Sequence, residues 1–266
     1  MIESFVLKLV TGIALMWLLM PRKDVTDGFF RIQMLVALGL SVLLVLVVQP
    51  SNPAQETNSA ASFMTSGLRT QAGSRLIYFA QLTAAVVAFA GHIVWKLGRR
   101  LPGAIAIYAI AILCLLSLAT ASLAGGVNFD SLNLLLSDLA SAAVLGATLT
   151  GMLLGHWYLT TPTMSIGPLS WFARALAVAA ILRLLMTSFS LFRFGFASHD
   201  LLHLLCLTVR IVGGILVPFA TAVVVARILK YRNTQSATGV LFAALILVFM
   251  GEMMAAWLEH DLRIPY

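Results

Sequence analysis

Four ionisable residues lie inside long apolar segments, at similar distances from one end of those segments. They are Asp138, Arg183, Arg210 and Glu252. If the segments are helices, each residue lies roughly 9 to 15 Å inside the predicted outer end of its helix, at 1.5 Å of rise per residue. Charged side chains are costly at that depth in lipid and usually face the protein interior. The sequence therefore predicts an intramembrane charge layer in which two acids and two bases neutralise one another.

Two interpretations of this charge layer stay open. A polar cavity open to the outer side would serve a proton path, an anionic substrate or a quinone head group. Two buried ion pairs would instead only hold four helices together. Helical spacing places His199 and His203 on the face of Arg210, and Glu259 on the face of Glu252.

Two histidines form a second candidate site near the opposite, predicted inner side. His92 and His156 each lie four or five residues before the end of an apolar segment, so their imidazoles could lie at one depth. Two such histidines are the ligands of a bis-histidine haem b, and Gly91 and Gly155 would leave room for the macrocycle. Three basic residues within 96–100 could pair with its propionates. In the alternative interpretation, each histidine hydrogen-bonds a neighbouring helix.

Other kinds of chemistry leave no signature in the chain. It has no phosphate-binding Gly-rich loop, HExxH or GxSxG, which argues against an ATP-driven pump acting alone. The two cysteines, Cys114 and Cys206, lie in apolar segments without metal-ligand spacing, so no metal site is expected. Basic residues are scattered between apolar runs, which does not indicate nucleic-acid binding.

The elements that would position these residues are transmembrane helices. The chain has 266 residues, of which 61% are hydrophobic and only 10% charged. A span needs about 20 mostly apolar residues and must satisfy its own backbone hydrogen bonds, which favours α-helices. Eight such runs occur, at Ser4–Met20, Phe29–Gln49, Leu76–Leu97, Leu101–Ala124, Leu132–Tyr158, Leu169–Phe192, Leu201–Ile228 and Ala237–Leu258. We expect an all-α membrane protein, a bundle of about eight transmembrane helices.

The distribution of basic residues between the runs predicts the orientation. Connections on one side carry Arg22, Lys23, Arg31, Lys96, Arg99, Arg100, Arg227, Lys230 and Arg232. The other side carries Lys8, Arg69, Arg75, Arg193 and Arg263. The positive-inside rule makes the first side cytoplasmic and places both termini outside. Residues 1–266 then form a single polytopic domain with an outer polar loop at 50–75, most simply in a bacterial inner membrane.

Two segments have composition that affects helix packing. Ala143, Ala147, Gly151 and Gly155 recur every fourth residue, a stripe of small side chains that permits close helix contact. Within the seventh run, the segment from Gly213 to Pro218 is the clearest candidate for a helix break.

Three functions are compatible with these features. The first is an integral membrane subunit of a redox or electron-transfer system that binds haem b or quinone. The second is a secondary transporter or channel that uses the charge layer. The third is a non-catalytic membrane anchor or assembly subunit. The lipid bilayer is the expected environment, and other membrane subunits or a quinone are the candidate partners.

Overall fold

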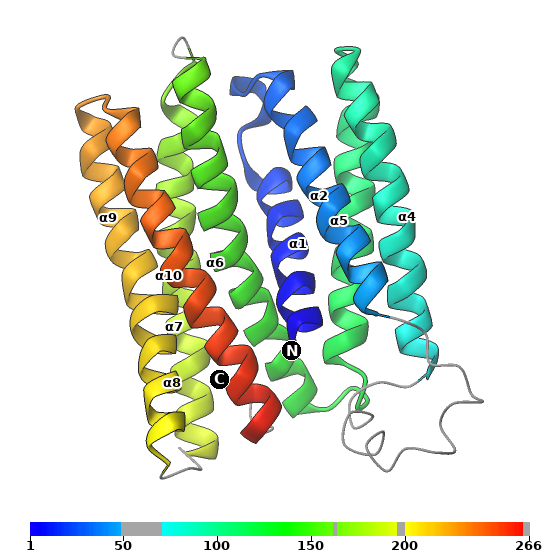
Figure 1. Cartoon of the computed structure of the whole chain (residues 1–266), viewed down its shortest axis with the longest axis vertical. Coiled ribbons are helices and arrows are strands. Elements are labelled where there is room, and N and C mark those ends of the chain that lie inside the picture. The colour runs from blue at the N-terminus through cyan, green and yellow to red at the C-terminus, as the bar shows by residue number, and fades with distance from the viewer. Residues whose placement is uncertain (49–70, 162–163, 196–199, 263–266) are drawn as a thin grey trace.

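The computed structural model describes residues 1–48, 71–161, 164–195 and 200–262. These residues form eight long apolar helices and no strand, and each helix is long enough to cross a membrane (Figure 1). The prediction of an all-α multi-pass membrane protein is therefore confirmed. Most of the predicted outer loop at 50–75, together with Arg69, His199 and Arg263, lies outside the described residues.

The helices follow one another along the chain, and the connections other than the one between α2 and α4 are short. In chain order they are α1 (Ile2–Leu19), the short 3-10 turn η1 (Arg22–Asp24), α2 (Asp27–Val47), α4 (Gln71–Lys96), α5 (Arg100–Ser122), α6 (Phe129–Thr160), α7 (Gly167–Phe194), α8 (Leu201–Ile211), η4 (Val212–Leu216), α9 (Val217–Lys230) and α10 (Thr234–Leu262). The α8, η4 and α9 segments together make the seventh span. Each span agrees with its predicted run to within a few residues at either end.

Local sequence explains several helix ends. The side chain of Asn128 caps α6 and forms a capping box with Ser131. Asp200 caps α8 by accepting a hydrogen bond from the backbone N–H of Leu202. Gly195 ends α7 with a φ of 67°, a left-handed conformation that favours glycine.

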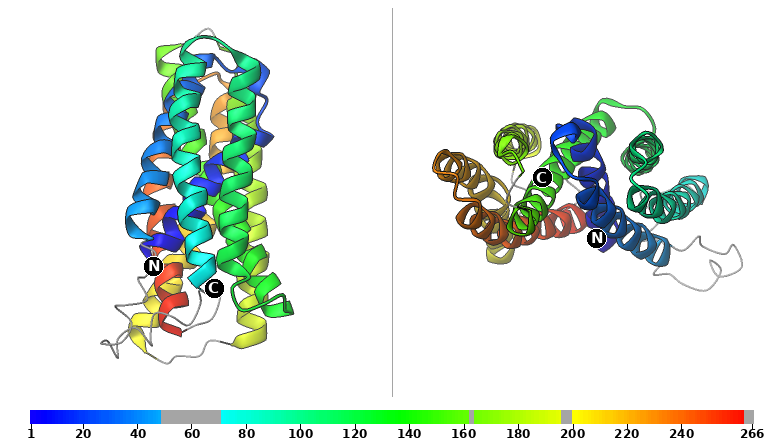
Figure 2. Two further views of the ribbon diagram at one scale, coloured as in Figure 1. Left: turned by 90° about the vertical axis from the view of Figure 1, so that its right-hand side faces the viewer. Right: turned by 90° about the horizontal axis from the view of Figure 1, so that it is seen from above.

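The α1 and α6 helices lie in the middle of the bundle. They pack on each other, α2, α4 and α5 extend to one side, and α7, α8, α9 and α10 extend to the other (Figures 1 and 2). The bundle end at which α1 begins is also the end at which α10 finishes (Figure 1). We name it the outer end, after the predicted orientation.

Glycine makes the central contact between α1 and α6 possible. A Cβ atom at Gly12 would overlap the carbonyl oxygen of Ala142, and one at Gly146 would overlap the backbone of Gly12. The two backbones therefore touch, as small residues allow in membrane helices. Of the predicted stripe, Gly151 faces Phe172 on α7, and Gly155 faces Thr238 on α10.

Candidate functional site: a buried charge network

Six ionisable side chains are connected in the half of the bundle nearer the outer end. They come from α1, α6, α7, α8 and α10, and we name them the charge network: Lys8, Asp138, Arg183, Arg210, Glu252 and Glu259. Acids and bases are equal in number, so the network has no net charge when all of them are ionised. Neutral pairing of this kind is what makes charged groups tolerable at membrane depth.

Lys8 joins two carboxylates and forms the first part of the network, the Lys8 arm. Its Nζ lies 2.7 Å from Oδ1 of Asp138 and 3.2 Å from Oε2 of Glu259. Ser122 donates a hydrogen bond of 2.6 Å to the other oxygen of Asp138. The side chains of Lys8 and Asp138 are 7% and 9% exposed, whereas that of Glu259 is 26% exposed. The arm thus connects a partly exposed acid to a buried one.

Glu252 is the centre of the second part, the Glu252 arm. Its Oε1 lies 2.7 Å from Nη1 of Arg210 and 3.5 Å from Nε of Arg183. Its Oε2 accepts a hydrogen bond of 2.5 Å from the hydroxyl of Ser141. All three charged side chains are at most 2% exposed. Two arginines on one carboxylate leave this arm with an excess positive charge.

The two arms meet on α6. Arg183 donates from Nη1 to the hydroxyl of Ser137 at 2.5 Å and to its carbonyl oxygen at 3.2 Å. Ser137 directly precedes Asp138 in the chain. The excess positive charge of the Glu252 arm therefore lies beside the carboxylates of the Lys8 arm, where it is balanced.

The contact between Gly12 and Gly146 sets the geometry of the Lys8 arm. Both α1 and α6 begin at the outer end, and helical side chains lean toward the N-terminus of their helix. Lys8 lies about 6 Å outward of Gly12 along α1, and Asp138 lies about 12 Å outward of Gly146 along α6. The long lysine side chain leans outward across this difference and reaches the carboxylate.

A π turn sets the geometry of the Glu252 arm. The η4 segment is π-helical and begins two residues after Arg210. A Cβ atom at Gly251 on α10 would overlap the backbone of Gly214, and one at Gly214 would lie 2.5 Å from Nη1 of Arg210. Glycine at both positions lets α10 approach, which brings Glu252 to the guanidinium. The candidate break at 213–218 is thus a π turn in a span that stays helical.

The structure brings the four residues of the predicted charge layer into one region and shows how they are paired. Glu252 binds both Arg183 and Arg210, whereas Asp138 binds Lys8. The sequence places Lys8 among the charges of the outer side. In the structure it lies within α1 and is buried. A lysine four residues after the start of an apolar run was the available signal. No signal in the sequence indicated the serines that complete the network, since isolated serines are common in membrane helices.

His203 takes part in a separate contact at the outer end. Its Nε2 lies 2.7 Å from Oδ2 of Asp261, and its Nδ1 lies 3.6 Å from Oδ2 of Asp200. Both carboxylates are at least half exposed. His203 thus lies near the surface, and its predicted neighbour on this face, His199, is outside the described residues.

The candidate haem ligands have different surroundings. Nδ1 of His92 lies 3.1 Å from the carbonyl oxygen of Arg31 on α2, while His156 is exposed. The α4 helix packs mainly on α2 and α5, and the α6 helix mainly on α1, α7 and α10. Seen from above, α1 and α2 lie between α4 and α6 (Figure 2). His92 therefore has the carbonyl contact that orients many haem-ligating histidines, whereas the described part of the chain provides no such contact for His156.

The chemistry available to the charge network is the transfer or exclusion of charge. Among residues 1–48, 71–161, 164–195 and 200–262, no group of three or more His, Cys, Asp or Glu side chains could hold a metal ion. Arginine stays protonated in proteins, whereas carboxylates and lysine can exchange protons. All three charged groups of the Lys8 arm can therefore exchange protons, while the two arginines give the Glu252 arm a permanent positive charge.

Comparison with known proteins gives no relative: no family model, curated protein or solved structure matches the chain.

Proposed function

We propose that this chain is an integral membrane subunit of a redox system, and that its Lys8 arm transfers protons between the outer face and the membrane interior. One observation gives this proposal its main support. Glu259, Lys8 and Asp138 form a continuous line of exchangeable groups from a partly exposed position to a buried one. Lines of acids and bases inside membrane helices are characteristic of proton relays.

The proton transfer follows from the order of the groups. The transfer starts when Glu259 takes up a proton; Lys8 then gives one proton to Asp138 and takes one from Glu259, so that its own charge is restored. Glu259 is then reprotonated from the outer face, where its side chain is partly exposed. Arg183 and Arg210 keep their protons throughout, and their field stabilises the negative charge that returns when Asp138 passes its proton on.

The redox part of the proposal rests on the inner histidines and on the position of the relay. Because α1 and α2 lie between α4 and α6, His92 and His156 of one chain would not share a haem b. A haem b held through His92 would supply one-electron transfer near the inner end. The contact from His92 to the carbonyl of Arg31 would hold its ring so that Nε2 is the free nitrogen. Quinone reactions couple electrons to protons, and a relay at the opposite end would exchange those protons.

A second candidate function, secondary transport, is favoured by the π turn. Discontinuities in membrane helices often accompany substrate or ion sites, and the π turn lies beside Arg210 of the charge network. In that case the network would bind an anion or a proton-coupled solute.

Two measurements test the proposal. The first is a reduced-minus-oxidised visible spectrum with a pyridine haemochrome assay, on the wild type and on His92→Ala protein purified after haem supplementation. A haem b spectrum that is lost in His92→Ala supports the redox function. A wild-type protein without a chromophore contradicts haem binding.

The second measurement is proton flux in liposomes with an internal pH-sensitive dye, during reduction and oxidation of an added short-chain quinone. Asp138→Asn is compared with Asp130→Asn, the same substitution on the same helix at an exposed position. We expect Asp138→Asn to lose most of the flux and Asp130→Asn to keep it. Equal flux in both variants contradicts the relay, and solute-dependent flux without a quinone requirement favours transport.

A further inference from the structure

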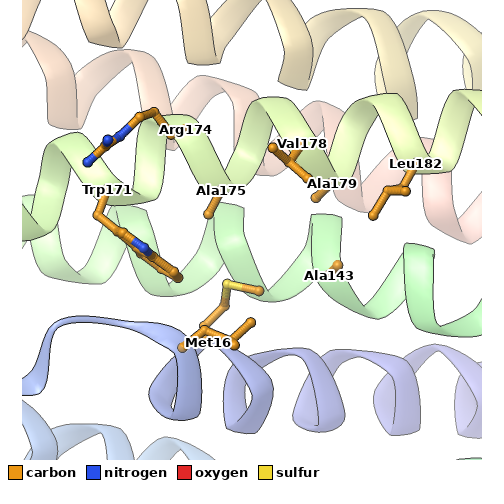
Figure 3. A pocket seen from close by; sticks show the side chains of 9 residues that line it. Met16, Ala143, Trp171, Arg174, Ala175, Val178, Ala179 and Leu182 are labelled. Atoms are coloured by element: carbon orange, nitrogen blue, oxygen red, sulfur yellow. The ribbon is translucent and has the colours of Figure 1, made fainter.

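A groove lies on the lipid-facing surface between α1, α6 and α7 (Figure 3). Its volume is about 390 Å³, within the range of small-molecule sites in proteins. Nine residues line it: Met16, Leu19, Ala143, Trp171, Arg174, Ala175, Val178, Ala179 and Leu182. Seven of them are aliphatic or methionine, and Arg174 alone is charged. The groove thus offers apolar walls and one cation.

The polar and apolar parts of the groove are separated along α7. Trp171 and Arg174 lie at one end, whereas Val178, Ala179 and Leu182 continue toward the other end (Figure 3). Val178 and Leu182 are 56% and 45% exposed, so the groove opens to the surroundings of the bundle. An occupant that matches these walls is amphiphilic, with its polar group at the Trp171 end.

The length and depth of the groove match one leaflet of a bilayer. From Trp171 to Leu182 the helix rises roughly 16 Å, about half of the hydrocarbon core. The α7 helix has 28 residues, or roughly 42 Å, so its ends extend beyond that core. Trp171 and Arg174 lie in its first two turns, at the predicted inner end. They are therefore placed near the inner headgroup region, where tryptophan and arginine are favoured.

The charge of the occupant follows from Arg174. This side chain is exposed, and the described residues give it no hydrogen-bond or ion-pair partner. A guanidinium at the headgroup level, beside apolar walls, is complementary to a phosphate with an attached acyl chain. A neutral occupant would leave the arginine unpaired.

We propose that this groove binds one anionic phospholipid of the inner leaflet, with its phosphate on Arg174 and an acyl chain along α7 toward Leu182. The site is independent of the proton relay, because its nine lining residues include no member of the charge network. Its inner end also lies away from the outer end, where Glu259 is partly exposed.

Trp171 provides a direct readout of this site. The protein is reconstituted in phosphatidylcholine vesicles in which an increasing fraction of dibrominated phosphatidylglycerol quenches tryptophan fluorescence. A parallel series uses dibrominated phosphatidylcholine in phosphatidylglycerol vesicles. Subtracting the signal of Trp171→Phe from that of the wild type isolates the quenching of Trp171 from that of the other four tryptophans.

We expect the wild type to prefer phosphatidylglycerol over phosphatidylcholine at Trp171 by roughly fivefold, the effect of one cation near an anionic headgroup. Arg174→Gln abolishes this preference. The matched control is Arg227→Gln, which removes an exposed arginine at the same end of the bundle, and it keeps the preference. Ala175→Phe fills the groove while retaining Arg174, and it lowers quenching by both lipids.

Three results would overturn the proposal. The first is equal quenching of wild-type Trp171 by the two lipids. The second is an unchanged preference in folded Arg174→Gln protein, with folding checked by the quenching of the remaining tryptophans. The third is displacement of brominated phosphatidylglycerol from Trp171 by an equimolar quinone, which would assign the groove to a neutral isoprenoid.

Discussion

Nζ of Lys8 on α1 lies 2.7 Å from Oδ1 of Asp138 on α6, and both side chains are buried. This ion pair joins the two central helices just outward of the point where Gly12 meets Gly146. The same residues thus fix the packing of the bundle and form the proposed relay, so stability and proton flux must be measured separately for each variant.

The first prediction concerns the coupling of Lys8 and Asp138. Lys8→Met should lower the free energy of unfolding by about 3 kcal/mol, because it leaves a buried carboxylate without its cation. Adding Asp138→Asn removes that charge, so the double variant should lose clearly less than the sum of the single losses. Equilibrium unfolding in detergent micelles measures all three. Additive losses would show that the pair is not coupled.

The second prediction compares two glutamates on α10. Glu252→Gln leaves Arg183 and Arg210 without their shared carboxylate, so we expect a loss of about 3 kcal/mol or more. Glu259→Gln should cost about 1 kcal/mol or less, since its side chain is partly exposed and Lys8 keeps Asp138. Relative to its loss of stability, Glu259→Gln should lower proton flux more than Glu252→Gln does, because Glu259 belongs to the relay. The same stability loss in both variants would contradict the assignment.

The third prediction tests the contact between α1 and α6. Gly12→Ala places a Cβ atom on the carbonyl of Ala142 and should destabilise the protein by about 1 to 3 kcal/mol. Gly39→Ala is the matched control, because nothing lies within 4 Å of a Cβ atom there. The control should be neutral or slightly stabilising, since alanine is the better helix former. Thermal unfolding of the two variants in the same detergent measures the difference. Equal losses of stability in the two variants would contradict this packing.

The fourth prediction separates arginine geometry from charge. Arg183 contacts Ser137 and Glu252 through different nitrogens, which the single ammonium of a lysine cannot reproduce. Arg183→Lys should therefore cost about 2 kcal/mol, the value of a charged hydrogen bond. Arg193→Lys, at an exposed ion pair with Asp130, should cost less than about 1 kcal/mol. An Arg183→Lys protein as stable as the control would mean that only charge matters there.

The sequence predicted the eight spans well, because hydropathy over about 20 residues is a strong signal. It also selected Asp138, Arg183, Arg210 and Glu252, since charges inside apolar runs are rare. The pairing could not be predicted. Lys8 and Glu259 are 251 residues apart, and neither periodicity nor composition indicates which helices become neighbours.

The packing details were also beyond the sequence. The stripe from Ala143 to Gly155 predicted a close contact for α6, yet the closest approach to α1 uses Gly146, which is outside the stripe. A single glycine becomes informative only when its partner, here Gly12, is known. The depth of His92 and His156 could be read from residue counts, but the placement of α1 and α2 between their helices could not.

The ion pairs of Lys8 have a consequence for how the protein is made. Lys8 belongs to α1, which is synthesised before α6 and α10, the helices of its partners Asp138 and Glu259. Until those helices are inserted, the ammonium lacks both carboxylates that it binds in the folded protein. Insertion of α1 is therefore expected to be completed only after α6 and α10 are made, with α1 held at the membrane surface or at the translocon until they arrive.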